Sequence, residues 1–366
     1  MTTIGITGVD GLLGWHLRSF LHGQAGVTVR GADKPEFASG EALLKFVSGC
    51  DAIVHLAGMN RGDEAEVARV NVELTEALLG ACSAAGAKPH IVFSSSTHIS
   101  RGTPYGESKK KCAALIRAWA SSNGATFTNL VLPNVYGESG RPFYNSAVST
   151  FCHQLAHGEK PEVKQDAGME LLHAQEVARE IYARIQQRYD GELYPPGHKI
   201  TVSALLAKLQ EMAGKYAANV IPDLRDGFDR DLFNTYRSYL FPAKSPVALD
   251  LKRDARGYLF EAAKSDNGGQ AFLSSTLPGI TRGNHYHTRK FERFLVIKGQ
   301  AVIRVRKLFS SETSEFSVSG DRPEYVDMPA LHTHNITNTG DGELLTLFWS
   351  SEVFDPAAPD TYQETV

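Results

Sequence analysis

Short apolar runs alternate with amphipathic stretches of helical length over the first two thirds of the chain. The strands and helices that this pattern predicts lie, in chain order, at residues 2–8, 12–23, 27–33, 42–49, 51–58, 72–86 and 90–96. Strands that alternate with helices of this length predict βαβ units and a parallel sheet. Because βαβ crossovers are right-handed, we expect a doubly wound α/β fold of the Rossmann type.

The pattern changes near Pro242 and Pro246. Beyond them, short apolar stretches are separated by glycine, proline and polar turns, and helical periodicity is absent. Such spacing predicts an all-β sandwich or barrel. A chain of 366 residues is also long enough for two cores. We therefore expect an α/β domain over residues 1–243 and a β domain over residues 244–366.

Composition and charge narrow the classes of partner and location. The 38 basic and 41 acidic residues give a net charge of −3, and the basic residues are scattered, so we expect no nucleic-acid partner. The first residues do not resemble a signal peptide, and no apolar run approaches the roughly 18 residues of a membrane helix. These features predict a cytoplasmic protein without membrane contact. The four cysteines are expected to be reduced core residues.

Three glycines mark the first strand-to-helix turn as a candidate nucleotide site. Gly8, Gly11 and Gly14 follow an apolar strand, and the expected helix starts at Leu12. Glycines at such a turn let the backbone approach a pyrophosphate, and the helix N-terminus favours the negative charge. A nicotinamide dinucleotide is therefore the expected cofactor.

The end of the second strand bears on which nicotinamide cofactor binds. An acidic side chain there binds the ribose hydroxyls of NAD, whereas a basic one binds the extra phosphate of NADP. Arg30, Asp33 and Lys34 supply both charges, so these residues leave NADPH and NADH open. The end of the next long strand is also expected to line the cofactor, with Leu56, Ala57 and Gly58.

A tyrosine and a lysine four residues apart suggest proton transfer. Tyr105 and Lys109 lie one helical turn apart on the same face. A nearby ammonium lowers the pKa of a phenol, so the tyrosine could exchange a proton with a carbonyl or alcohol during hydride transfer. The serine run 94–96 ends the preceding strand, from which a hydroxyl could contact the same oxygen.

Taken in order, the segments TGVDGLLG, HLAG, FSSS, YGESK and LPNVYG resemble the extended short-chain dehydrogenase/reductase family. Many members of that family act on nucleotide sugars. The resemblance implies that Ser96, Tyr105 and Lys109 form a catalytic triad. It also implies that Asn71 supports the proton relay and, with Tyr105 and Lys109, contacts the cofactor. Leu132 departs from the family, whose members commonly carry arginine before the Pro-Asn pair.

The β domain carries a candidate metal site. His285 and His287 are two residues apart, so a β-strand points both imidazoles to one face, and Glu292 can reach the same point from the following strand. His334 would supply a fourth ligand. Imidazole and carboxylate suit zinc, iron, manganese or nickel. We expect one divalent metal and favour zinc, although the ligand types leave its identity open.

The spacing from Gly279 through these ligands to Gly299 is similar to the first cupin motif, and PALHTHNITN resembles the second. The resemblance implies a metal-binding cupin, a jelly-roll barrel. Pro323 and Leu331 stand where cupins usually carry glycine. Whether the metal polarises a substrate or supports the barrel stays open, and so does the choice of acid and base among Tyr258, Tyr286, Lys298 and His332.

The two halves together, with the joining stretch DLFNTYRSYL and the tail EVFDPAAPDTYQETV, resemble the CapF-type capsular polysaccharide synthesis enzymes. The resemblance implies a bifunctional enzyme acting on a UDP-2-acetamido-2,6-dideoxy-4-keto-hexose. The cupin would epimerise carbon 3, and the reductase domain would reduce carbon 4 with NADPH. The product would be UDP-2-acetamido-2,6-dideoxy-L-talose, on the route to UDP-N-acetyl-L-fucosamine. Members of both domain families commonly pair, so we expect a homodimer.

Two other hypotheses remain at this point. In the first, the protein is a monofunctional keto-sugar reductase whose cupin serves dimerisation or sensing. In the second, the α/β domain has lost hydride transfer and acts as an NAD(P)-dependent sensor. The intact set Ser96, Tyr105 and Lys109 argues against the second hypothesis.

Overall fold

The computed structural model describes residues 1–254 and 257–366. Its contacts divide the chain into two compact units, Met1–Thr150 with Lys164–Val202, and Phe151–Val163 with Ser203–Val366. This division differs from the boundary expected after residue 243. It groups residues 203–243 with the β-rich unit, because helices in this segment hydrogen-bond to that unit, for example Asn234 Nδ2 to the Arg289 carbonyl at 2.7 Å.

A six-stranded parallel sheet forms the centre of the first unit. Its order is β2-β1-β3-β4-β5-β8, and every neighbouring pair is parallel. The strands are β1 (Thr2–Thr7), β2 (Val27–Ala32), β3 (Ala52–His55), β4 (His90–Ser96), β5 (Phe127–Leu132) and β8 (Gly191–Leu193). The strand order reverses between β1 and β3, and such a switch point is where ligands bind in open α/β sheets. The expected Rossmann-like sheet is confirmed.

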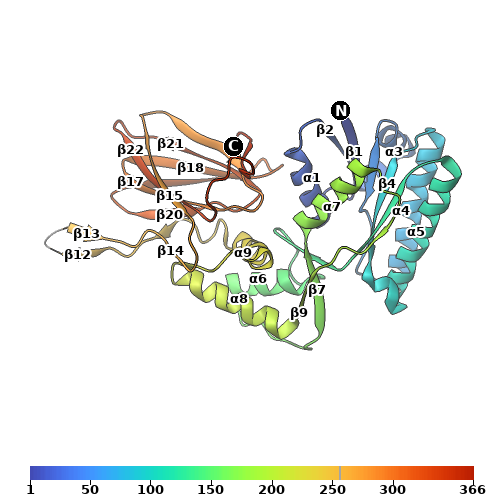
Figure 1. Ribbon diagram of the computed structural model, residues 1–366, viewed down its shortest axis with the longest axis horizontal. Helices are drawn as coiled ribbons and strands as arrows, with labels where there is room; N and C mark the ends of the chain where they lie inside the picture. Colours follow the sequence, from blue (N-terminus) through green and yellow to red (C-terminus); the bar gives the residue numbers. More distant parts are fainter. Residues whose placement is uncertain (255–256) are drawn as a thin grey trace. The chain divides into compact units, whose positions relative to one another are not determined.

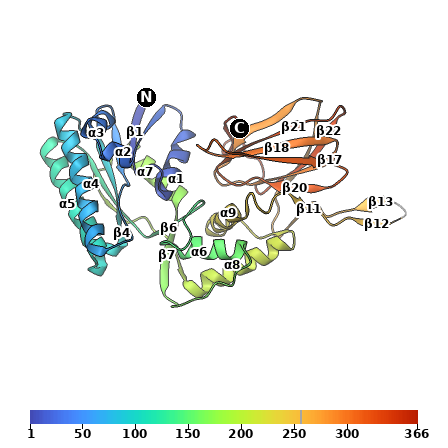
Figure 2. The same cartoon turned by 180° about the vertical axis from the view of Figure 1, so that it is seen from behind.

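Helices cover both faces of this sheet (Figures 1 and 2). One face packs against α1 (Leu12–His22) and α7 (Ala174–Gln187), which share a core cluster with the apolar strands. The opposite face packs against α3 (Gly40–Val47), α4 (Glu64–Ala84) and α5 (Pro104–Asn123). A four-residue helix α2 (Lys34–Phe37) links β2 to α3, and the 3₁₀ turn η1 (Thr97–Arg101) links β4 to α5.

A three-stranded sheet extends the first unit beyond β5. It orders β6 (Asn134–Tyr136), β7 (Gly168–His173) and β9 (His198–Thr201), with β6 parallel and β9 antiparallel to β7. Cys50, Cys82, Cys112 and Cys152 are all buried free thiols, as the sequence predicts.

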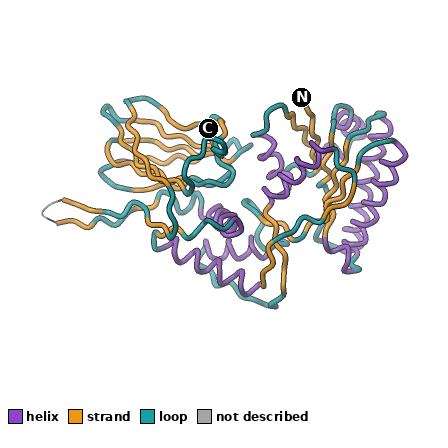
Figure 3. The backbone as a smooth tube through the Cα atoms, viewed as in Figure 1, coloured by secondary structure: helices purple, strands orange, loops and turns teal. Residues whose placement is uncertain are grey.

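Two five-stranded antiparallel sheets form most of the second unit, drawn in orange in Figure 3. The first sheet is β11 (Val247–Ala248), β20 (Glu324–Asp327), β17 (Glu292–Lys298), β22 (Leu344–Ser350) and β15 (Gln270–Thr276). The second is β19 (Thr313–Ser319), β18 (Gln300–Lys307), β21 (His332–Asn338), β16 (Thr281–Tyr286) and β23 (Tyr362–Gln363). A single apolar cluster contains residues of both sheets, so the sheets pack face to face as the all-β pattern predicts.

Helices and short strands complete the second unit. Helix α8 (Val202–Ala217) leads through β10 (Val220–Ile221) to α9 (Gly227–Leu240), and β10 pairs with β14 (Lys264–Ser265). Helix α6 (Ala147–Ala156) begins in the first unit and ends in the second. Strand β12 (Lys252–Asp254) pairs antiparallel with β13 (Gly257–Leu259). In the described part of the chain, no helix is long and apolar enough to cross a membrane.

Candidate functional site

The glycine turn after β1 leaves room for a pyrophosphate at the start of α1. Gly8 has a φ of +69°, and a Cβ on it would lie 2.9 Å from the Ala57 backbone nitrogen. A Cβ on Gly14 would lie 2.2 Å from the Gly8 carbonyl oxygen. Gly11 caps α1 without a side-chain hydrogen bond, and the first turn of α1 carries no acidic residue. The first N–H groups of the helix are therefore available to an anion.

The segment that follows β3 lies directly beside this turn. The backbone N–H groups of Leu56 and Ala57 donate to Thr7 Oγ1 at 3.2 and 3.1 Å. Asn71 Oδ1 accepts from the Met59 backbone, and a Cβ on Gly58 would lie 2.9 Å from that oxygen. Asn71 therefore holds residues 58–59 in place, at the end of the segment that is expected to line the cofactor.

The charged residues around the end of β2 take different positions. Arg30 lies in the middle of β2, opposite Gly5, and its guanidinium lies against Gly49 in the loop before β3. It therefore does not join the glycine turn. Asp33 caps α2, where its carboxylate accepts from the Lys34 backbone nitrogen at 3.0 Å. One oxygen of that carboxylate is therefore engaged at the N-terminus of this short helix.

Tyr105 and Lys109 lie on adjacent turns of α5, as their spacing predicts. Lys109 Nζ lies 5.8 Å from the centroid of the Tyr105 ring and donates to the Ser94 carbonyl at 2.9 Å. Ser96 Oγ, at the end of β4, accepts from the His98 backbone nitrogen at 3.3 Å. Its hydroxyl hydrogen remains free to donate elsewhere. Lys109 Nζ would also lie 3.9 Å from a Cβ on Gly58, which puts this group beside the cofactor edge.

The electrostatics of this pair correct one expectation. We expected the Lys109 ammonium to lower the phenol pKa, but burial raises the pKa of Tyr105 above its usual value. Burial also lowers the pKa of Lys109 to about 8. The reason is geometric, because Lys109 bonds to a carbonyl rather than to the phenol oxygen. Tyr105 therefore carries its proton at neutral pH, as a proton donor must, although the raised pKa makes it a weaker acid.

The four predicted metal ligands meet inside the β sandwich. His285 is the second-last residue of β16, His287 directly follows this strand, Glu292 starts β17 and His334 lies in β21. One ligand atom from each residue lies within 4.8 Å of all the others. Glu292 Oε2 is 3.1 Å from His287 Nε2, 3.6 Å from His334 Nε2 and 3.7 Å from His285 Nε2. Residues from both sheets therefore converge on one point.

Three buried nitrogens at this point are suited to a metal ion. The Nε2 atoms of His285, His287 and His334 have no hydrogen-bond partner among the described residues. His287 Nδ1 lies 2.6 Å from the Asp360 carbonyl and His334 Nδ1 lies 3.1 Å from the His332 carbonyl. A carbonyl only accepts, so both Nδ1 atoms carry the proton and both Nε2 lone pairs face the centre.

The charge states of the cluster agree with this. Burial lowers the pKa of His334 to about 4, so its imidazole is neutral at neutral pH. Burial alone would raise the pKa of Glu292, but the three neighbouring imidazoles hold it well below its usual range. Three neutral imidazoles and one carboxylate form a donor set that suits a divalent metal such as zinc.

Asp360 is a functional residue that the sequence does not reveal. It lies in the C-terminal tail, and its carboxylate accepts from the backbone nitrogens of Thr288, Arg289 and Lys290 at 3.1, 3.0 and 2.8 Å. Its carbonyl orients His287. The following strand β23 pairs with β16. No spacing rule connects position 360 to position 287, so only the fold shows that the tail contacts the histidine cluster.

Leu331, which stands where cupins usually carry glycine, has a left-handed backbone. This residue has a φ of +60°, which favours glycine, yet its side chain is fully buried. Its backbone nitrogen donates to the His287 carbonyl at 2.7 Å. The backbone thus keeps the left-handed conformation without a glycine, and the turn still supports a ligand.

The candidates for acid and base differ in access. Tyr286 is fully buried and stacks on Tyr362, and burial raises its pKa. His332 is buried, with Nδ1 2.8 Å from the Ala330 carbonyl. Lys298 is exposed at the far end of β17 from Glu292. The side chain of Tyr258 lies outside the described part of the structure.

A buried cluster of polar side chains connects α1 to the rest of the first unit. His16 in α1 donates to the Glu138 carbonyl at 3.0 Å, and His173 Nε2 lies 3.0 Å from Glu138 Oε2. Gln175 donates to the His16 carbonyl at 3.1 Å. Although burial opposes ionisation, His173 and His16 hold the pKa of Glu138 below its usual value. This brace was missed from the sequence because its members are far apart in the chain.

Comparison with known proteins agrees with both halves of the structure. Residues 4–195 match the NAD dependent epimerase/dehydratase family, and residues 252–362 match the polysaccharide biosynthesis C-terminal domain. A UDP-2-acetamido-2,6-beta-L-arabino-hexul-4-ose reductase from Pseudomonas aeruginosa is 31% identical over 362 residues, which cover 98% of this chain and 97% of the relative.

Solved structures show the same family relationship. The capsular polysaccharide assembling protein CapF from Staphylococcus aureus is 34% identical, with a TM-score of 0.64 over 99% of this chain and 100% of that chain. A UDP-glucose 4-epimerase from Thermus thermophilus in complex with NAD is 17% identical and covers 66% of this chain, with a TM-score of 0.56, which shows a shared fold. The chain therefore belongs to the NAD dependent epimerase/dehydratase family and, within it, to the CapF-type capsular polysaccharide enzymes.

Proposed function

We propose that this protein reduces the carbon-4 keto group of a UDP-2-acetamido-2,6-dideoxy-4-keto-hexose with a nicotinamide cofactor. The observation that carries the proposal is the position of Tyr105 and Lys109 beside the glycine turn, at the edge of the sheet where Gly58 and Asn71 meet. The full-length relative from Pseudomonas aeruginosa, by its name a reductase of a UDP-linked hexulose, supports the substrate class.

The residues have separate roles in this reduction. The nicotinamide, when bound, supplies a hydride to carbon 4. Tyr105 donates its phenolic proton to the ketone oxygen. Ser96 donates its hydroxyl hydrogen to the same oxygen, and the Lys109 ammonium, held by the Ser94 carbonyl, supplies positive charge beside the segment that would line the cofactor.

We propose NADPH as the preferred cofactor. One oxygen of the Asp33 carboxylate, the group that would bind the ribose hydroxyls of NADH, accepts a hydrogen bond at the N-terminus of α2. Lys34 at this position offers a positive charge instead. Gly8, Gly11, Leu12 and Gly14 would hold the pyrophosphate, with Leu56, Ala57 and Gly58 along its edge. Arg30 was expected to contact the cofactor, but its guanidinium lies against Gly49.

We further propose that the β domain is a cupin that epimerises carbon 3 before the reduction. A hydrogen on carbon 3 is acidic while carbon 4 is a ketone, because the carbanion is delocalised as an enolate. His285, His287, Glu292 and His334 would hold a zinc ion that either polarises the substrate or fixes the site. Reduction then removes this acidity, so the order of the two steps is set by the chemistry.

The product of both steps would be UDP-2-acetamido-2,6-dideoxy-L-talose, on the route to UDP-N-acetyl-L-fucosamine for capsule or O-antigen polysaccharide. The homodimer and the cytoplasmic location remain predictions of the sequence.

An assay of cofactor oxidation tests the reductase. Consumption of NADPH and of NADH is measured with the 4-keto sugar nucleotide for the wild type, Tyr105→Phe and Tyr182→Phe. Tyr182 is a half-buried tyrosine of α7 and serves as the matched control. We expect turnover with NADPH that falls by about 10²-fold or more in Tyr105→Phe alone. Full activity of Tyr105→Phe would contradict the proposal.

A further inference from the structure

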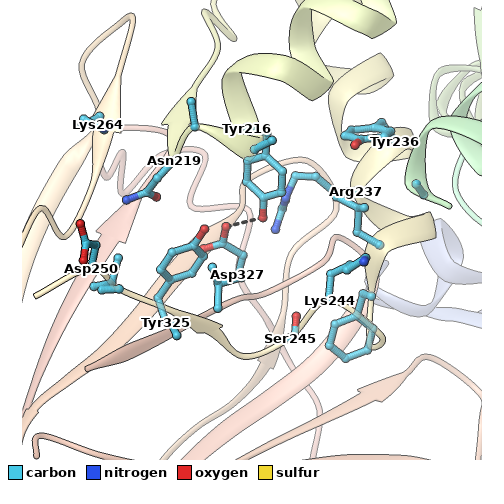
Figure 4. A pocket seen from close by; sticks show the side chains of 18 of the residues that line it. Tyr216, Asn219, Tyr236, Arg237, Lys244, Ser245, Asp250, Lys264, Tyr325 and Asp327 are labelled. Atoms are coloured by element: carbon cyan, nitrogen blue, oxygen red, sulfur yellow. Dashed lines mark hydrogen bonds between the residues drawn. The ribbon is translucent and has the colours of Figure 1, made fainter. Parts of the chain in front are cut away.

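The second unit contains a cavity of about 670 Å³ that neither proposed step uses. Its walls come from the ends of α6, α8 and α9, the segment 244–252 and strand β20 (Figure 4). The volume lies within the range of about 300–1,000 Å³ that is typical of small-molecule sites. Asp327 of β20 lines the cavity and pairs with Arg293, the neighbour of Glu292 in β17. Adjacent strand residues point to opposite faces, so the cavity lies on the other side of β17 from the histidines.

Asp327, in one wall of the cavity, belongs to a network of ion pairs and hydrogen bonds. Arg293 donates from Nε to Asp327 Oδ1 at 2.8 Å and from Nη2 to Oδ2 at 3.0 Å. Tyr216 donates its hydroxyl to the same carboxylate at 2.6 Å. The Arg293 guanidinium also lies 3.5 Å from the centroid of the Tyr325 ring. The Asp327 charge is therefore neutralised and its oxygens are occupied.

Arg237 brings a second guanidinium that has no acid of its own. Its side chain lines the cavity and is 4% exposed. One Nη bonds to Asn234 and the other to the Met328 carbonyl, whereas Nε has no hydrogen-bond partner among the described residues. Two buried guanidiniums thus lie near one buried carboxylate. A buried positive charge in excess of the buried acids around it favours an anion in the adjoining space.

The other charged residues that line the cavity do not neutralise this excess of positive charge. Glu261 pairs with Lys264, so these two charges neutralise each other. Asp250 is offset by Lys252, two residues later on the lining. Lys244 then remains as an exposed cation at the rim. Figure 4 places Lys244 and Ser245 below Arg237, where an ammonium and a hydroxyl could reach the same ligand.

The rest of the lining suits an organic body rather than a free inorganic ion. Tyr236, Leu240 and Phe241 of the α9 region contribute apolar surface, and Tyr325 adds a ring on the opposite side. Rings of this kind bind planar or ring-shaped groups through stacking and edge contacts. A phosphate has several acceptor oxygens for Arg237, Lys244 and Ser245, and a ring can occupy the apolar part.

We propose that this cavity binds a phosphorylated organic anion of about mononucleotide size, with its phosphate at Arg237 and Lys244 and its ring among the tyrosines. This site is separate from the glycine turn and from the histidine cluster. It gives the protein a second binding site for a phosphate ester, independent of both proposed reactions.

Titration calorimetry with UMP, uridine and inorganic phosphate tests the proposal on the full chain. The variants are Lys244→Glu, which reverses the rim charge, and Ala217→Trp, which places an indole on an exposed lining position. Lys298→Glu is the matched control, because Lys298 is exposed and is not part of the lining. Each variant's thermal unfolding temperature is compared with that of the wild type to verify folding.

We expect both cavity variants to bind one UMP fewer than the wild type and the control, or to bind it at least about tenfold more weakly at that site. Because the proposed reductase site also recognises a uridine nucleotide, the comparison rests on the difference between variants and not on the total. Uridine is expected to lack the cavity site, and phosphate to bind it more weakly than UMP. Equal UMP binding in all four proteins, or uridine binding as tightly as UMP, would overturn the proposal.

Discussion

Glu292 and Arg293 are neighbours in β17, and their side chains serve different sites on opposite faces of the strand. Glu292 Oε2 lies 3.1 Å from His287 Nε2 in the metal cluster. Arg293 Nε lies 2.8 Å from Asp327 Oδ1, on the wall of the cavity. Because side chains alternate along a strand, one strand separates the metal centre from the cavity. A change at either residue should therefore affect one site and spare the other.

Removal of the carboxylate from the metal cluster should release the metal. Glu292→Gln replaces an anionic ligand by a neutral amide, and we expect the bound zinc to fall from about one per chain to a small fraction. Elemental analysis of the purified protein measures this content. Glu315→Gln, at an exposed glutamate in β19, is the control and should keep the metal. A zinc content unchanged in Glu292→Gln would contradict the predicted ligand set.

The support from Asp360 should be measurable without loss of any ligand. Its carboxylate accepts three backbone N–H groups of residues 288–290, next to His287. Asp360→Asn keeps the backbone carbonyl that orients His287 but weakens this turn. We expect zinc affinity to fall by about 10- to 100-fold, less than for a ligand substitution. Competition with a chelator of known affinity gives the value, and an unchanged affinity would show that the tail has no such role.

Lys109 should reduce stability at neutral pH and less so at alkaline pH. Burial lowers its pKa from 10.5 to about 8, so the folded state binds the proton more weakly than the unfolded chain. The resulting destabilisation is fully present below pH 8 and is relieved as the pH rises from about 8 to 10.5. We expect Lys109→Met to be more stable than the wild type by up to about 3 kcal/mol at pH 7.

This difference between Lys109→Met and the wild type should shrink towards zero near pH 10.5. Denaturant unfolding at both pH values measures it, and the same variant should lose reductase activity. A difference that does not depend on pH would mean that the ammonium is not desolvated in the folded state.

The left-handed backbone at Leu331 predicts an unusual order of stability. In most places glycine is less stable than alanine by about 0.5–1 kcal/mol. At a φ of +60° alanine is strained, whereas glycine is not. Both changes remove a fully buried leucine side chain and should cost about 2–5 kcal/mol. Denaturant unfolding should show Leu331→Gly at least as stable as Leu331→Ala, and the reverse order would contradict the assigned conformation.

Periodicity and spacing predicted those parts of the protein that depend on local pattern. The strand before Gly8 and the helix after it are set by apolar period and by glycine, so they could be predicted. The metal ligands could be predicted because His285 and His287 alternate on one strand and Glu292 starts the next. The parallel sheet followed from the alternation of strands and helices.

Contacts between distant segments could not be predicted. Asp360 reaches His287 only because the tail folds back onto β16, and His16 meets Glu138 only because α1 packs near the end of β6. The pKa of Tyr105 was predicted in the wrong direction, because spacing fixes the helix face but not the atom to which Lys109 bonds. Helices α8 and α9 pair with the β-rich unit through side-chain contacts that their own pattern does not reveal.

The most direct test of the proposed function is deuterium incorporation during turnover. The 4-keto sugar nucleotide is reduced with NADPH in deuterated water by the wild type and by His285→Ala, and the products are analysed by NMR. We expect deuterium at carbon 3 with the wild type, and no deuterium or slower incorporation with His285→Ala. Reduction by the wild type without deuterium at carbon 3 would contradict epimerisation by the β domain and would leave a monofunctional reductase.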